Sequence, residues 1–168
     1  MAGDAVHVAV SGGGRADDEA CRLAEQVGLE LARLGAVVVT GGLGGAMEAA
    51  CRGAKAGGGT TVGILPSDDR ADANPWVDVA VPTGLGEGRN ALVVRAAEAV
   101  IAVAGEFGTL SEIALALRLG RPVVGLGTWE LARNGRPVEA IVAVATPAEA
   151  AGTAVAMARL RRAPPTGS

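Results

Sequence analysis

Aromatic side chains are almost missing from this sequence. Its 168 residues include one phenylalanine, Phe107, two tryptophans and no tyrosine. The apolar fraction is nevertheless 49%, and small residues such as alanine and valine supply much of it, beside 26 glycines. Because small side chains fill space only where backbones approach closely, this composition favours tightly packed layers of helix and sheet.

Basic clusters, long apolar runs and cysteine motifs are also absent. The net charge is −3 and the arginines are scattered among acids, so nucleic-acid binding is not expected. No apolar run reaches the roughly 18 residues that a membrane helix requires, and Asp4 stands where a secretory signal would carry basic charge. The two cysteines, Cys21 and Cys51, belong to no metal or redox motif. We therefore expect reduced cysteines, no metal site, no membrane partner and a cytoplasmic location.

Short β-branched runs alternate with longer amphipathic stretches, which is typical of βαβ units and a parallel sheet. We predict one α/β domain over residues 1–162, with a doubly wound, mostly parallel sheet and helices on both faces in a Rossmann-like arrangement. A disordered tail is expected at 163–168, a surface loop at 66–75, and Asn90 as the N-cap of the helix that follows. The expected strands are 6–10, 36–40, 60–65, 76–81, 100–104, 122–125 and 138–144, and the expected helices are 16–34, 46–56, 90–98, 110–119 and a last one from Pro147.

Three glycine-rich turns, at 11–14, 41–45 and 105–109, each follow a predicted strand and precede a predicted helix. In a doubly wound sheet such turns share the carboxyl edge, where free backbone N–H groups and positive helix ends face one crevice. Glycine also lets a phosphate approach the backbone closely. We therefore expect a phosphorylated small molecule at this edge. The expected ligand-binding residues are Ser11, Gly12, Gly13, Gly41, Gly42, Gly44, Gly45, Glu48, Gly105, Glu106, Gly108 and Thr109.

Two familiar phosphate-binding motifs are missing. Lys55 is the only lysine and Gly-Lys-Ser/Thr does not occur, which excludes a P-loop NTPase. That single lysine, without a supporting motif, also disfavours a pyridoxal-dependent lysine decarboxylase. A dinucleotide-binding turn needs G-x-G-x-x-G and an acid about 20 residues further on. The first turn here has three consecutive glycines, and Thr40 and Gly41 stand where that acid should be, so NAD is not the expected ligand.

The stretches TGGLGGAMEAACRGAKAGGGTTVGILP (40–66), GRN (88–90) and GEFGTLSEIALAL (105–117) are similar to the LOG superfamily, whose members were long labelled lysine decarboxylases. The similarity covers about residues 6–144 in the same order. The family's GTxxE motif is here Gly108 to Glu112, and Arg89 precedes Glu112 at the family's separation. The resemblance implies that Arg89 and Glu112 cleave the base–ribose bond of a nucleoside 5′-monophosphate, with the Thr109 hydroxyl as an extra phosphate donor. It also implies a homodimer.

The chemistry of such cleavage suits these two residue types. Breaking an N-glycosidic bond builds positive charge on the ribose, which a carboxylate stabilises while it also deprotonates water. An arginine near the same centre holds a hydroxyl or phosphate group. Structural roles remain open: Thr109 to Glu112 also fits a capping box, in which Glu112 serves the helix start. Arg89 alone would be a surface arginine, Glu48 a helix-dipole residue, and His7 a satisfied structural histidine within a strand.

The sequence departs from the family pattern at two places. Ala104-Gly105-Glu106 replaces the family's PGG, and the longer GGGxxGLMG hallmark is shortened in residues 41–48. A carboxylate about 4 Å from a phosphate, at an effective dielectric near 20, would repel it by roughly 4 kcal/mol. Both departures resemble the uncharacterised bacterial and molybdenum-cofactor-carrier branches. Two functions follow from the resemblance: a nucleotide-like ligand that is bound and hydrolysed, or alternatively a non-catalytic carrier of a nucleotide or the molybdenum cofactor.

Overall fold

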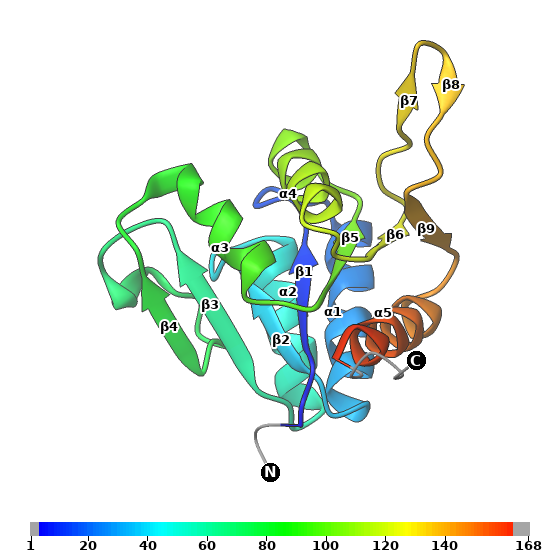
Figure 1. The fold of residues 1–168 in the computed structure, drawn as a ribbon. Helices are drawn as coiled ribbons and strands as arrows, with labels where there is room; N and C mark the ends of the chain where they lie inside the picture. Colours follow the sequence, from blue (N-terminus) through cyan, green and yellow to red (C-terminus); the bar gives the residue numbers. More distant parts are fainter. Residues whose placement is uncertain (1–3, 163–168) are drawn as a thin grey trace.

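A seven-stranded parallel sheet forms the centre of the molecule (Figure 1). The structure, a computed structural model, describes residues 4–162. The sheet strands are β1 His7–Ser11, β2 Val37–Thr40, β3 Thr61–Leu65, β4 Val79–Pro82, β5 Ala99–Val103, β6 Val123–Leu126 and β9 Ile141–Val144. The helices are α1 Asp18–Arg33, α2 Ala46–Ala56, α3 Asn90–Arg95, α4 Phe107–Arg118 and α5 Pro147–Arg162, with 3-10 turns at Arg70–Asp72 and Gly86–Arg89.

The strand order is β4-β3-β2-β1-β5-β6-β9, and every neighbouring pair in this sheet is parallel. From β1 the chain runs outward in one direction through β2 to β4, and then returns to the other side of β1 with β5. This reversal makes the carboxyl ends of β1 and β5 the switch point where α/β proteins bind ligands. The predicted doubly wound fold is confirmed.

Helices cover both faces of the sheet. Side chains of α1, α2 and α5 pack with β1, β5 and β6 in one buried cluster, while α3 and α4 pack on the opposite face in a second. Alternation along β1 divides its residues between the two: Val8 and Val10 belong to the first cluster, and Ala9 to the second. Strands buried on both faces are apolar at nearly every position, as those of β5 are.

Helices α1 and α2 approach each other at backbone distance. A Cβ added to Gly28 would collide with the backbone carbonyl of Ala50, and one added to Gly53 would collide with that of Glu25. The backbone of each helix therefore contacts a glycine of the other helix. This is the close approach that the small-residue composition predicts.

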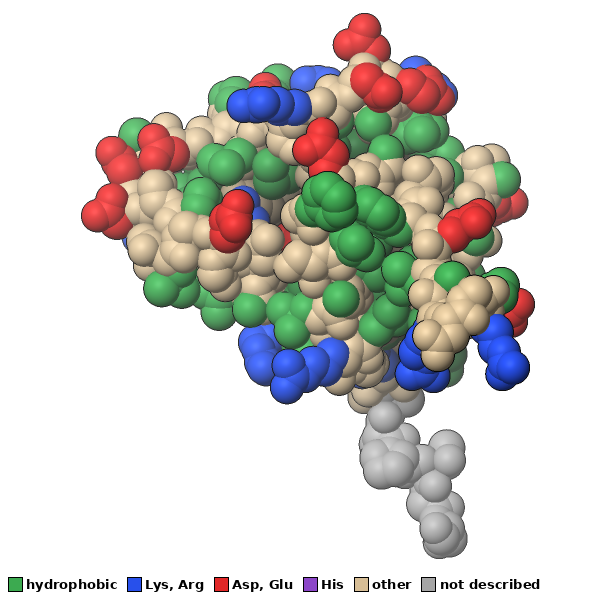
Figure 2. All heavy atoms as spheres, turned by 90° about the horizontal axis from the view of Figure 1, so that it is seen from above, with side chains coloured by type: hydrophobic (Ala, Val, Ile, Leu, Met, Phe, Trp, Pro, Cys, Tyr) green, Lys and Arg blue, Asp and Glu red, His purple; other side chains and the backbone are tan. Residues whose placement is uncertain are grey.

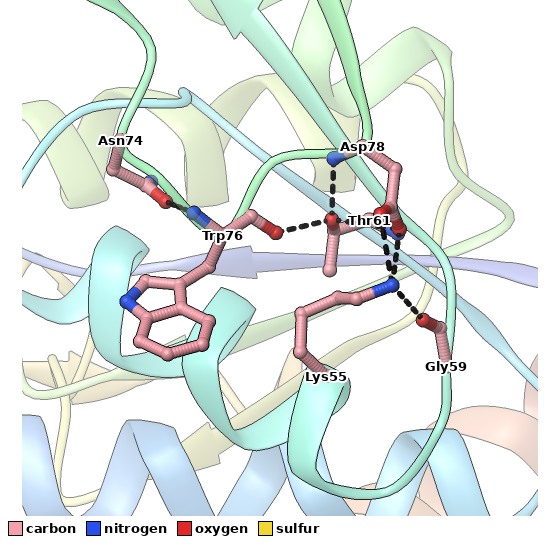
Figure 3. A network of polar contacts seen from close by, with 6 residues as sticks. All are labelled: Lys55, Gly59, Thr61, Asn74, Trp76 and Asp78. Carbon is pink, nitrogen blue, oxygen red and sulfur yellow. Dashed lines mark hydrogen bonds and ion pairs between the residues drawn. The ribbon is translucent and has the colours of Figure 1, made fainter.

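A polar network joins the end of α2 to the edge of the sheet (Figure 3). The Lys55 ammonium donates to both carboxylate oxygens of Asp78 at 2.8 Å and to the Gly59 carbonyl at 3.0 Å. Asp78 also accepts from the backbone N–H of Thr61, whose hydroxyl donates to the Trp76 carbonyl at 2.6 Å. These contacts fix the amino ends of β3 and β4, so the loop that leaves β3 at the carboxyl edge is anchored where it enters β4 at the opposite edge.

Several local expectations need correction. Asn90 is the first residue of α3 rather than its N-cap, because the 3-10 turn Gly86–Arg89 runs directly into the helix. The last strand begins at Ile141 instead of 138, because the backbone N–H of Val138 still donates to the Leu131 carbonyl across the base of the hairpin of β7 (Ala132–Arg133) and β8 (Arg136–Pro137). This hairpin, absent from the prediction, projects from the body in Figure 1. The tail 163–168 lies outside the described residues.

Two further features concern the described part of the chain only. Between residues 4 and 162, no helix is both long and apolar enough to cross a bilayer. Over the same residues, no group of three or more histidine, cysteine, aspartate or glutamate side chains is arranged to hold a metal ion. His7 lies at the start of β1, where its backbone N–H donates to Glu98 and its ring approaches the Ala96 carbonyl, in agreement with a structural role.

Candidate functional site

A cavity of about 370 Å³ opens at the carboxyl edge of the sheet. This volume lies near the lower end of the range for small-molecule sites. Figure 2 looks down on this edge, and apolar side chains gather near the centre of the face. Five chain segments line the cavity: the turn after β1, the turn after β2 with the start of α2, Pro66 after β3, the 3-10 turn before α3, and the start of α4. Among the lining residues are Ser11, Gly12, Gly13, Gly14, Gly41, Leu43, Met47, Arg89, Asn90, Glu106, Gly108, Thr109 and Glu112.

The first two turns pack against each other. The Gly13 carbonyl accepts the backbone N–H of Ala46 at 3.1 Å, and an added Cβ on Gly12 would lie 2.6 Å from the Ala46 Cβ. Gly45 has φ +63° and presses against the backbone of residues 13 and 14. The first N–H of α2 is therefore bound to the first turn instead of facing the cavity. The second turn reaches the lining through Gly41 and Leu43.

The third turn presents the start of α4 to the cavity. Ala104 and Gly105 both have positive φ, 46° and 101°, which reverses the chain after β5. A Cβ on Gly105 would lie 2.5 Å from the Cβ of Thr109, so glycine is required where the turn meets the helix. Gly108 and Thr109 line the cavity in the first turn of α4, where backbone N–H groups lack helical partners and the helix dipole is positive.

Arg89 is buried against the floor of the cavity, with its side chain only 9% exposed. A Cβ on Gly41 would lie 2.5 Å from Arg89 Nη2, so the guanidinium occupies the space that a side chain at 41 would fill. Nη1 donates to Asn90 Oδ1 at 2.5 Å, whereas the buried Nε has no hydrogen-bond partner within residues 4–162. Burial lowers the pKa of Arg89, but arginine titrates so far above neutrality that the group stays cationic.

Glu112 faces Arg89 across the same cavity. Its Oε1 lies 4.0 Å from Arg89 Nη1, and its Oε2 accepts a hydrogen bond from the Ser11 hydroxyl. Burial raises the pKa of Glu112, and the Ser11 hydrogen bond and the Arg89 charge only partly offset that shift. The capping-box interpretation is wrong, because α4 begins at Phe107 with Glu106 as its N-cap, and the Glu112 carboxylate is directed to Ser11.

Glu106 lies at the rim of the cavity and is exposed to solvent. At an exposed position water screens a carboxylate, and the repulsion at 4 Å falls from roughly 4 kcal/mol towards about 1 kcal/mol. The replacement of the family glycine by Glu106 therefore leaves the interior of the cavity available to an anion. Glu87, which is also exposed, belongs to the lining as well.

The structure brings together most, but not all, of the residues singled out from the sequence. Ser11, Gly12, Gly13, Gly41, Arg89, Glu106, Gly108, Thr109 and Glu112 line the cavity. Gly42, Gly44, Gly45 and Gly105 belong to the turns but lie outside the lining, and Glu48, on α2, lies outside it as well.

Asn74 is a residue that sequence reasoning missed. Its side-chain amide donates to the Leu43 carbonyl at 2.9 Å and its backbone N–H to the Gly42 carbonyl at 2.8 Å. The residue is 8% exposed, and it holds the second turn against the cavity from a loop 31 positions away. No motif marks this role; the Asn-Pro pair at 74–75 indicates only a turn.

Known proteins are similar to this chain over most of its length. An uncharacterized protein of Archaeoglobus fulgidus is 42% identical over 121 residues, which is 72% of this chain and 80% of that protein. A molybdenum cofactor binding protein of the phototrophic bacterium Rippkaea orientalis has a TM-score of 0.76 at 34% identity, covering 85% of this chain and 91% of that one. The Moco carrier protein of Chlamydomonas reinhardtii has a TM-score of 0.80 at 31% identity, over 94% and 99%.

These findings confirm the expected relation to LOG-like proteins of the molybdenum-cofactor-carrier branch. The model of one family, SLOG cluster4, matches residues 5–151, nearly the whole chain. The chain belongs to the SLOG cluster4 family.

Proposed function

We propose that this protein binds a phosphorylated, ring-bearing small molecule at the carboxyl edge of its sheet and carries it without turnover, in the manner of a molybdenum-cofactor carrier. The observation that carries the proposal is Arg89, a buried cation that lines the cavity and whose Nε has no partner among residues 4–162. A buried guanidinium with an unpaired N–H donor costs free energy unless a ligand accepts a hydrogen bond from it. A phosphate oxygen is the acceptor that best suits arginine's planar donors.

The surrounding groups fit a phosphate. The first turn of α4 supplies backbone N–H donors at Gly108 and Thr109, close to the positive end of the helix. The glycines at 12, 13 and 41 present only backbone to the cavity. The relatives from Rippkaea orientalis and Chlamydomonas reinhardtii, described as molybdenum cofactor binding and carrier proteins, support the choice of a pterin phosphate.

The contacts of Glu112 support a carrier over a hydrolase. A general base must present a free carboxylate oxygen to the water that it deprotonates. One oxygen of Glu112 accepts a hydrogen bond from the Ser11 hydroxyl, and the other lies 4.0 Å from Arg89 Nη1. Glu112 in this arrangement acts as a wall of the anion site rather than as a base.

A second candidate function is hydrolysis of a nucleoside 5′-monophosphate to base and ribose 5-phosphate. The observation in its favour is the approach of Arg89 and Glu112 to 4.0 Å within one cavity. A homodimer and a cytoplasmic location, both expected from the sequence, stay predictions that size-exclusion chromatography and cell fractionation test.

The experiment purifies the protein from cells that synthesise the molybdenum cofactor, then measures bound molybdenum and pterin per chain. We expect close to one intact cofactor on the wild type, little on Arg89→Met, and a wild-type amount on the matched control Arg95→Met, an exposed arginine outside the cavity lining. Incubation with adenosine monophosphates, followed by chromatography, measures free base. Base release that Glu112→Gln abolishes would establish the hydrolase instead, and a wild type that retains no phosphorylated ligand and releases no base would contradict both functions.

A further inference from the structure

Phe107 is the chain's only phenylalanine, and it is exposed. Its exposed fraction is 79%, the largest among the exposed large apolar side chains of the described residues. It is the first residue of α4 and stands between Glu106 and Gly108, both of which line the cavity. Single exposed leucines are common on protein surfaces and need no explanation. An exposed phenylalanine beside a binding cavity does need one, because this chain has only three aromatic residues in all.

Trp129 holds this ring in place. The two ring centroids lie 5.6 Å apart at an interplanar angle of 37°, a tilted arrangement that aromatic pairs favour. The Trp129 indole N–H donates to the Glu106 carbonyl at 3.2 Å, and Trp129 packs against the buried cluster beneath α4. The neighbouring Thr128 hydroxyl donates to the Ala104 carbonyl at 2.5 Å. Two of the three aromatic residues of the chain thus pack against each other beside the first turn of α4; neither ring is part of the cavity lining itself, which Glu106 and Gly108 reach on either side of Phe107.

We propose that Phe107 is a stacking platform for the planar heterocycle of the ligand whose phosphate lies against Arg89. This inference rests on the proposed function and narrows the ligand to a phosphate ester that carries an aromatic ring, such as a pterin or a purine. The cavity is small, so a ligand with both groups places its phosphate among the glycine turns and its ring at the rim. A ring stacked on Phe107 would cover exposed apolar surface, and the contact with Trp129 reduces the conformational freedom that Phe107 loses when it binds the ligand.

The test compares two probes on the same variants by titration calorimetry: guanosine 5′-monophosphate, which has a ring, and ribose 5-phosphate, which lacks one. We expect the wild type to bind the nucleotide more tightly. Phe107→Ala should weaken nucleotide binding by about 5- to 20-fold, the loss of one base–aromatic contact, and change ribose 5-phosphate binding by less than about twofold. Phe107→Trp should retain the nucleotide affinity, while Phe107→Leu, apolar but without a π face, should lose most of it.

Because Phe107 is exposed, these variants should keep the wild-type unfolding temperature, which serves as the folding control. Equal affinity of the wild type for the two probes would overturn the platform but not the proposed phosphate site. An equal loss of affinity for both probes in Phe107→Ala would have the same consequence. A change of oligomeric state in Phe107→Ala without a selective loss of the nucleotide would assign the ring to a contact between copies, and would also overturn it. A wild type that binds neither probe would contradict the proposed function itself, which is a different result.

Discussion

Replacing Gly41 by alanine tests the site through a single added methyl group. The new Cβ would lie 2.5 Å from Arg89 Nη2, 2.7 Å from Arg89 Cζ and 2.7 Å from Met47 Sδ. These are the far ends of two flexible side chains, so the guanidinium and the thioether can move aside. The stability cost should therefore stay near the lower limit for overpacking, about 1 kcal/mol.

Ligand affinity should suffer more than stability. A displaced guanidinium no longer presents its donors to a phosphate oxygen, and hydrogen bonds to charged groups contribute about 1.5–3 kcal/mol. The expected loss is roughly 10- to 100-fold in the dissociation constant. Gly44→Ala is a matched control in the same turn, because its Cβ would meet only a Glu48 carboxylate oxygen at 4.0 Å and its φ is not positive.

The assay is calorimetric titration with guanosine 5′-monophosphate, combined with chemical unfolding of each variant. We expect Gly41→Ala to bind poorly but fold, and Gly44→Ala to match the wild type within about twofold in affinity and about 0.5 kcal/mol in stability. Wild-type affinity in Gly41→Ala would refute the placement of Arg89 in the binding site. An equal loss in both variants would show that the turn, rather than the arginine, determines binding.

Three further predictions concern stability. Gly28→Ala should destabilise the fold by about 3 kcal/mol or more in denaturant titrations, because the added Cβ meets a rigid backbone carbonyl, whereas Gly152→Ala, in open space on α5, should stabilise it by about 0.5–1 kcal/mol; similar effects of both would contradict the close helix packing. Since burial raises the pKa of Glu112, the folded state keeps the carboxyl proton to higher pH than the unfolded state does. The stability of the wild type should therefore fall relative to that of Glu112→Gln as pH rises above about 4.3. A pH-independent difference between the two would contradict the raised pKa. Burial opposes ionisation of Asp78, but its hydrogen bonds to an ammonium and a backbone N–H hold its pKa below the usual range. Asp78→Asn should therefore cost about 1 kcal/mol at neutral pH, with the difference shrinking as pH falls below about 3.9, and a difference that grows in acid would be the opposite result.

The sequence predicted those parts of the fold that depend on local patterns. Buried strands such as β5 are short apolar runs bounded by glycine turns, and α1 has its N-cap at Asp17, whose side chain accepts from the Ala20 N–H at 2.8 Å. The β7–β8 hairpin was missed although Asn134 and Gly135, both with positive φ, are a recognised hairpin signal. The flanking strands are only two residues long and carry no apolar alternation, so the surrounding sequence does not indicate a hairpin.

The site was predicted less completely because its contacts join distant segments. The hydrogen bond between Ser11 and Glu112 spans 101 positions, and nothing local distinguishes it from a helix-capping glutamate. The burial of Arg89 depends on the absence of a side chain at Gly41, a relation visible only once the two segments meet. The family resemblance, through the spacing of Arg89 and Glu112, predicted that these two residues share a site. Their distance, burial and hydrogen-bond partners could be known only from the structure.

Backbone amide shifts measured by ¹H–¹⁵N NMR test the central claim most directly, since they report which amides meet the anion. On addition of guanosine 5′-monophosphate, we expect the largest changes at the amides of residues 11–14, 41–43 and 107–109, and their disappearance in Arg89→Met. Shifts confined to other regions, such as the β7–β8 hairpin, or no shifts at saturating ligand, would contradict an anion site built from these three turns.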